Sequence, residues 1–110
     1  MAAVSKGILA LYREYCGRGA MRTRTIVQDD YVVCFLEDIY TPLERTLIEA
    51  GRWAEVNQAR NLSKQALRER FNAVVEAATE RKVIAFFSQV HMEPDMALEG
   101  FVLESKNGSA

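Results

Sequence analysis

Residues 17–44 read GRGAMRTRTIVQDDYVVCFLEDIYTPLE, and this stretch decides the fold of the chain. Two runs rich in β-branched and aromatic side chains, residues 23–28 and 31–37, are typical of strands. Only Asp29 and Asp30 separate them, and aspartate tolerates the positive φ that a two-residue hairpin loop requires. The stretch therefore predicts a tight antiparallel hairpin.

The end of the same stretch predicts the start of a helix. Thr41 suits the N-cap position, and Pro42 suits the first helical position because its missing N–H has no partner to lose there. Glu44, three residues after the threonine, completes a capping box. A helix is therefore expected to begin at Pro42, and Gly51 is expected to interrupt it.

A further helix is predicted ahead of the stretch. Apolar side chains recur at spacings of three and four between Val4 and Tyr15, so residues 3–16 are predicted to form an amphipathic helix. Gly17 is expected to end it, because glycine lacks a Cβ and readily adopts the left-handed conformation used at helix C-termini.

The C-terminal half changes its hydrophobic period twice. Residues 53–78 follow a helical period, which predicts one long helix whose weakest point lies at residues 61–64. Residues 82–90 are apolar on both faces at their centre, which is typical of an interior strand. Residues 91–97 contain Glu-Pro-Asp and are predicted to form a loop, and residues 98–104 are predicted to form a fourth strand.

These elements predict an α+β fold with the order α-β-β-α-α-β-β. Two hairpins joined by helices most economically form one four-stranded antiparallel sheet covered on one face by helices, including the long one. A helix much longer than the sheet is wide would leave apolar surface uncovered, and a homodimer would bury that surface. We therefore expect a homodimer of a single domain, residues 1–104, with a flexible tail at residues 105–110.

The composition is that of one folded domain. A chain of 110 residues is long enough for one hydrophobic core, and 49% apolar and 26% charged residues exclude a wholly disordered chain. No apolar run approaches the ~20 residues needed to cross a bilayer, so we expect no direct membrane insertion. Cys16 and Cys34 fall in different elements, and two reduced, packed thiols are the expectation for a cytoplasmic protein.

The ordered set of motifs resembles the MpsC-like family. The residues that carry the resemblance are Gly17-Arg18-Gly19, the strand from Tyr31 to Glu37, Thr41-Pro42-Leu43-Glu44, and the segment from Arg81 to Ser88. It covers the chain from about Val4 to Glu104. The chain departs from the family pattern at Ala20, where proline is expected, and at Glu80-Arg81, where a glycine often precedes the third strand.

The resemblance implies a small bacterial domain named after a membrane-potential-generating system. It implies an accessory role beside a system linked to cation or inorganic-carbon uptake, with a membrane transport subunit as a partner. It brings no catalytic residue to carry over, and the motifs predict neither a cofactor nor a catalytic or metal centre.

Four arginines and one acid lie between residues 13 and 24, although the net charge of the chain is −1. Arg18, Arg22 and Arg24 form a candidate anion or partner site, because guanidinium groups match carboxylate or phosphate. A solvated strand face explains the same residues. The net charge and the absence of a base-stacking aromatic cluster beside the arginines argue against a nucleic-acid partner.

His91 is the remaining candidate, since it is the one side chain with an ordinary pKa near neutrality and it follows a strand. It could form a loose metal site with Glu93 and Asp95, but the spacing is not one that metal sites use, and an exposed loop histidine is the simpler interpretation. Cys34 would need His91 close by to act as a nucleophile, and its place between Val33 and Phe35 indicates a packed thiol.

Three hypotheses of function follow. The first is a non-catalytic accessory or regulatory domain that binds a partner protein. The second is a sensor of a small anion or metabolite, enclosed by the region from Gly17 to Arg24 and the loop after His91. The third is an enzyme built on Cys34 or His91.

Overall fold

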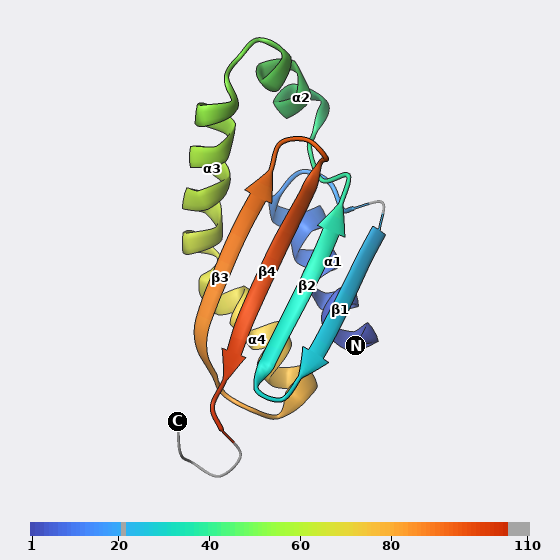
Figure 1. The fold of residues 1–110 in the computed structure, drawn as a ribbon, viewed down its shortest axis with the longest axis vertical. Helices are drawn as coiled ribbons and strands as arrows, with labels where there is room; N and C mark the ends of the chain where they lie inside the picture. Colours follow the sequence, from blue (N-terminus) through green and yellow to red (C-terminus); the bar gives the residue numbers. More distant parts are fainter. Residues whose placement is uncertain (21, 106–110) are drawn as a thin grey trace.

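The structure, a computed structural model, describes residues 1–20 and 22–105 as four helices and one four-stranded sheet (Figure 1). The elements in chain order are α1 (Ala2–Tyr15), β1 (Arg22–Gln28), β2 (Tyr31–Glu37), α2 (Pro42–Glu49), α3 (Trp53–Ala66), α4 (Arg68–Thr79), β3 (Val83–His91) and β4 (Met96–Leu103). Every pair of neighbouring strands is antiparallel, and the strand order is β1-β2-β4-β3. The predicted α+β class and element order are confirmed. The predicted tail begins at residue 105, and its residues 106–110 lie outside the described residues.

The two-residue loop of the first hairpin and the capping box that follows it are both present, as predicted. Gln28 pairs with Tyr31, so Asp29 and Asp30 form the two-residue loop, and Asp29 has a φ of 53°. Thr41 caps α2 through its hydroxyl oxygen, which accepts from the Glu44 N–H at 3.1 Å, and the Glu44 carboxylate accepts from the Thr41 N–H at 2.9 Å. The capping box is complete.

The predicted long helix is divided in two at Leu67. Its φ and ψ of −98° and 4° lie outside the helical range, and the break falls three residues beyond the segment predicted to be weakest. The change of direction lets α3 run beside the edge strand β3, while α4 turns behind the sheet (Figure 1). Phe71 and Val75 of α4 are thereby buried completely in the core.

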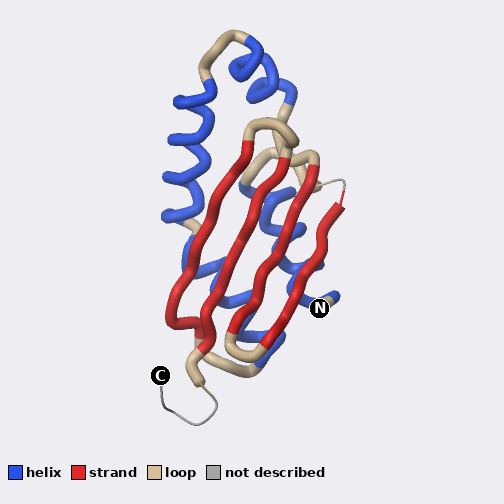
Figure 2. Tube along the Cα trace, in the orientation of Figure 1, coloured by secondary structure: helices blue, strands red, loops and turns tan. Residues whose placement is uncertain are grey.

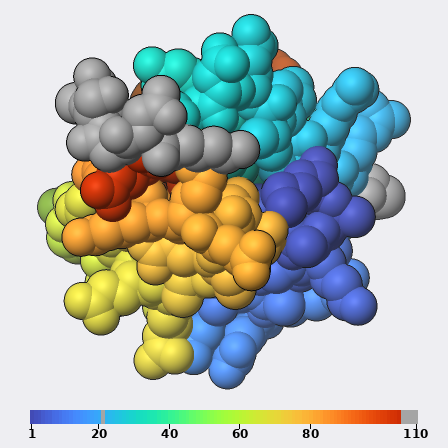
Figure 3. Space-filling model, turned by 90° about the horizontal axis from the view of Figure 1, so that it is seen from below, coloured from blue at the N-terminus to red at the C-terminus, as the bar shows by residue number. Residues whose placement is uncertain are grey.

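The fold has two layers, with helices on one face of the sheet only. Figure 2 shows the strands unobstructed in front and the helices behind or beside them. Seen from the end in Figure 3, α1 and α4 lie side by side against the sheet, and they contact each other. The core between the layers takes the alternate side chains of β2 and β4 that face the helices, among them Leu36 and Phe101.

The second hairpin is longer than expected. β3 continues to His91 and β4 already begins at Met96, so only residues 92–95 connect them instead of the predicted loop over 91–97. The connection is held by Asp95, whose backbone oxygen accepts from the Asp38 N–H at 3.0 Å and whose carboxylate accepts from the Ile39 N–H at 2.8 Å. These contacts across the sheet explain why the strands pair further than their sequence indicates.

Candidate functional site

The face of the sheet that no described helix covers is the largest functional candidate. Residues in register across the four strands point alternately to the helices and away from them, and 16 point away. Ten of these are apolar or glycine: Ile26, Tyr31, Val33, Phe35, Ala85, Phe87, Met96, Leu98, Gly100 and Val102. We call these 16 positions the open face.

Large apolar side chains stand out from the open face. Phe87 is 59% exposed, Tyr31 57% and Ile26 47%. A hollow of about 180 Å³ lies on the same face between Phe35, Leu98, Met96 and His91. The open face thus carries both projecting apolar side chains and an apolar hollow. Such a combination is typical of a surface that binds protein rather than of a sheet face exposed to water.

The predicted site residues Arg22 and His91 lie at one end of this face. The register places Arg22, Glu37, Met96 and His91 in one row across β1, β2, β4 and β3. Arg22 pairs with Glu37 at 3.4 Å, so a carboxylate of the chain itself stands between the arginine and the histidine. Arg24 lies exposed two residues further along β1 on the same face.

Arg18 lies apart from the open face in an ion-pair network. It contacts Asp38 at 3.0 Å, and Asp38 also pairs with Arg45. Arg45 in turn contacts Asp95 at 3.0 Å. The structure therefore brings Arg22, Arg24 and His91 to one face and engages Arg18 in joining the end of β2 to α2 and to the connection between β3 and β4.

His91 and its acidic neighbours do not converge. The His91 ring Nδ1 lies 2.9 Å from the Pro94 backbone oxygen, while the Asp95 carboxylate accepts from the backbone and from Arg45. Among residues 1–20 and 22–105, no three His, Cys, Asp or Glu side chains are placed to hold a metal ion.

The two cysteines are free thiols, as predicted, and Cys34 is buried among the core side chains. Cys34 faces the helices and His91 lies on the open face, so the sheet separates them. Burial raises the pKa of both the Cys16 and the Cys34 thiols. A raised pKa leaves little thiolate, the nucleophilic form, at neutral pH.

A second candidate is a buried polar cluster of Tyr12, Lys64, Ser88 and Glu99. The Lys64 ammonium donates to Glu99 Oε1 at 2.8 Å, to the Tyr12 hydroxyl at 2.6 Å and to Ser88 Oγ at 3.4 Å. Glu99 is 0% exposed and Lys64 2%. Burial, and next the neighbouring Glu99 carboxylate, raise the pKa of Tyr12 well above its ordinary value, so its hydroxyl stays protonated.

This cluster is costly to bury. The attraction between the two charges offsets only part of the free energy lost when they are removed from water. An ion pair in a core is therefore weak evidence for a purely stabilising role. Glu99 Oε2 is buried and, within the described part of the chain, has no hydrogen-bond partner. The cluster is therefore a place where the fold retains polar groups that an apolar core would not need.

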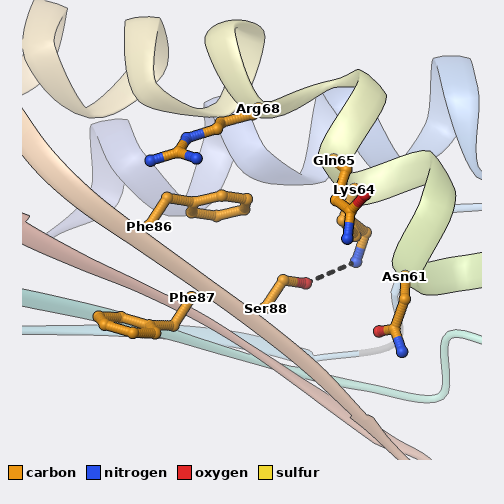
Figure 4. Close-up of a pocket in the computed structure, with 7 residues that line it drawn as sticks. All are labelled: Asn61, Lys64, Gln65, Arg68, Phe86, Phe87 and Ser88. Atoms are coloured by element: carbon orange, nitrogen blue, oxygen red, sulfur yellow. Dashed lines mark hydrogen bonds between the residues drawn. The ribbon is translucent and has the colours of Figure 1, made fainter.

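Lys64 and Ser88 also line a cavity of about 610 Å³ between α3 and β3 (Figure 4). The helical side adds Asn61, Gln65 and Arg68, and the strand side adds Phe86 and Phe87. A second buried cation, Arg60, pairs with Glu44 and donates to the Ile39 backbone oxygen at 3.0 Å, which ties α3 to α2. Arg60 therefore has a structural explanation, whereas Lys64 faces a cavity.

The sequence predictions missed both the open face and the buried cluster. A signal for the cluster was present, because Arg60 and Lys64 fall at four-residue steps after Val56, which places them on the buried stripe of the helix. Glu99 likewise lies between Ala97 and Phe101 on the core side of β4. Charges on an apolar stripe are the pattern to look for.

Comparisons with known proteins return one finding. A protein-family model described as "Na+-translocating membrane potential-generating system (MpsC)" matches residues 1–105. Searches of curated proteins and of solved structures find no match. In the described part of the chain, each helix is too short or too polar to pass through a bilayer.

Proposed function

Since the chain belongs to the MpsC family, we propose that it is a non-catalytic accessory domain of a membrane-potential-generating system, acting on the cytoplasmic side by binding protein. It does so as a homodimer in which the open faces of two copies pack together. The free thiols of Cys16 and Cys34 fit a reducing compartment. The separation of Cys34 from His91 supports binding over nucleophilic chemistry.

The open face is the observation that carries the proposal. Four strands about 4.8 Å apart and seven residues long at about 3.3 Å per residue span roughly 440 Å² in projection, to which side-chain relief adds. That is the order of the roughly 600–1,000 Å² that each partner buries in a specific interface. Sheets pack face to face through such apolar surfaces.

A second copy fits this face because the face complements itself. In a twofold arrangement the same surface supplies both sides of the contact. Phe87 and Tyr31 project from it, and the hollow beside Phe35 and Leu98 offers an apolar seat for a projecting ring. In this proposal the apolar surface that the dimer buries lies on the sheet. The reason for the dimer is therefore the open face, and not the overlong helix that the sequence predicted.

The test of dimerisation is sedimentation equilibrium of the full chain and of Phe87→Glu. Burying the exposed 59% of a phenylalanine side chain of roughly 200 Å² removes about 120 Å² from water, worth about 3 kcal/mol in each copy. Because a symmetric dimer contains two such side chains, the substitution should weaken association by about 1,000-fold or more. Leu62→Glu is the matched control, since Leu62 is 57% exposed on α3, away from the open face.

A monomeric wild-type chain, or equal weakening by both substitutions, would contradict the dimer. The accessory role is tested separately by measuring membrane potential in cells that lack the chain and are complemented with wild type, Phe87→Glu or Leu62→Glu. Recovery with wild type and Leu62→Glu only is expected. Full recovery with all three variants would show that the open face is not needed for the role.

A further inference from the structure

The cavity between α3 and β3 has the features of a ligand site, and its lining shares only Phe87 with the open face. Its volume of about 610 Å³ falls in the range of small-molecule sites. Figure 4 shows Phe86 and Ser88 directed from β3 toward the helices, with the Lys64 ammonium reaching Ser88, whereas Phe87 points to the other side of the strand. The remaining question is which chemistry the lining would recognise.

The deep end of the cavity is polar and held in place. Lys64 and Ser88 each hydrogen-bond to Glu99 Oε1, both at 2.8 Å, so the strand fixes both groups from below. The bond from Lys64 to Ser88 is the longest of the three that the ammonium makes, at 3.4 Å, beyond the usual range for this type of bond. A ligand oxygen entering from the cavity can replace Ser88 as the third acceptor of Lys64.

The charge of the lining favours a single negative charge on the ligand. Glu99 neutralises Lys64, whereas in the described ranges Arg68 has no carboxylate within ion-pair distance. One cation is therefore left over. A guanidinium presents two parallel N–H donors that match the two oxygens of a carboxylate.

The wall formed by β3 is aromatic and rigid. The Phe86 ring stacks on Phe71 at 5.7 Å between ring centroids and lies 5.1 Å from Phe101. A ring fixed by two core neighbours offers a flat apolar surface, against which a planar body packs without ordering a mobile side chain. Asn61 and Gln65 add amide groups on the opposite side.

We propose that this cavity binds a small carboxylate with a planar apolar body, the carboxylate contacting Arg68 and Lys64 and the body lying on Phe86. The assignment goes beyond the proposed function, because it concerns the space between α3 and β3, which shares only Phe87 with the open face, and another class of partner. It also differs from the predicted anion site, since it uses none of Arg18, Arg22, Arg24 or His91.

The test is titration of the isotope-labelled full chain with 2-naphthoate, followed through backbone amide NMR shifts. Saturable shifts are expected in the second half of α3, at the start of α4 and in β3. Arg68→Gln should weaken binding about tenfold or more, because a charge-assisted hydrogen bond is lost. Naphthalene-2-carboxamide, which has the same body without the charge, should be weaker by a similar factor.

Arg52→Gln is the control, because it removes the same charge from an exposed position at the start of α3, outside the cavity lining. It should leave the affinity for 2-naphthoate unchanged. Both arginines are exposed, so neither substitution threatens folding. The proposal is overturned if no saturable shift appears, if the shifts fall on β1 and β2 rather than on α3, α4 and β3, or if Arg52→Gln and Arg68→Gln weaken binding equally.

Discussion

Removing the ammonium of Lys64 alone should destabilise the fold strongly, and removing both charges of its ion pair should cost less than the two single losses added together. In Lys64→Met the Glu99 carboxylate keeps its burial and loses its cation, and its Oε2 has no hydrogen-bond partner among residues 1–20 and 22–105 to compensate. Breaking a buried pair in this way costs about 3–5 kcal/mol. The total stability of a domain of this size is about 5–15 kcal/mol, so the variant loses a large share of it.

The companion substitution is Glu99→Gln, which removes the negative charge and keeps an oxygen for the Tyr12 and Ser88 hydroxyls. Alone it leaves Lys64 charged and buried, so it should also cost about 3 kcal/mol. The double variant Lys64→Met/Glu99→Gln has no buried charge. Its loss should be smaller than the sum of the single losses by about 2 kcal/mol or more.

Urea unfolding followed by circular dichroism measures these free energies. The matched control is the exposed pair of Arg52 and Glu55, 3.8 Å apart, where the same substitutions should couple by less than about 1 kcal/mol. The reasoning is refuted if the losses in free energy of unfolding at Lys64 and Glu99 are additive. It is also refuted if either single substitution lowers that free energy by less than about 1 kcal/mol.

Two further predictions concern Glu80 and Glu44. Glu80 is exposed at the end of α4 with a φ of 57°, so Glu80→Gly should raise the free energy of unfolding by about 0.5–1 kcal/mol in urea titrations, and Glu69→Gly within α4 should lower it by about 1 kcal/mol. For Glu44, burial acts to raise the carboxyl pKa, but hydrogen bonds from Arg60 and Thr41 outweigh it and the folded-state pKa is lowered. The unfolded chain therefore binds more protons in the acid range, so this stabilisation is complete above the ordinary glutamate pKa and is lost as pH falls through the folded-state pKa. Urea titrations across this range should show the deficit of Glu44→Gln against wild type shrinking as the pH falls, and a constant deficit would contradict the reasoning.

The features predicted from sequence are those that neighbouring residues determine. Asp29-Asp30 and the box from Thr41 to Glu44 act within a few residues, and both formed as expected. The resemblance also located Glu80 where a glycine is usual, and the structure shows the positive φ that explains the preference.

The features that were missed depend on packing between distant segments. The helix breaks at Leu67 because α4 must reach the sheet beside α1 while α3 follows β3. The residues around Leu67 contain no helix-breaking signal from which this position could be predicted. Lys64 meets Tyr12 and Glu99 only after three elements come together. Which face of a sheet stays uncovered is likewise a property of the whole fold, because β2 and β4 are apolar on both faces.

The account depends most on the open face being the surface that a second copy covers. Carbene footprinting of the full chain, at protein concentrations below and above the dissociation constant of the dimer, measures this directly. Labelling of Phe87 and Tyr31 should fall as the dimer forms, while Leu62 and Leu43, which are 57% and 69% exposed on the helices, should stay labelled. A dimer that protects Leu62 or Leu43 and leaves Phe87 and Tyr31 labelled would contradict the account.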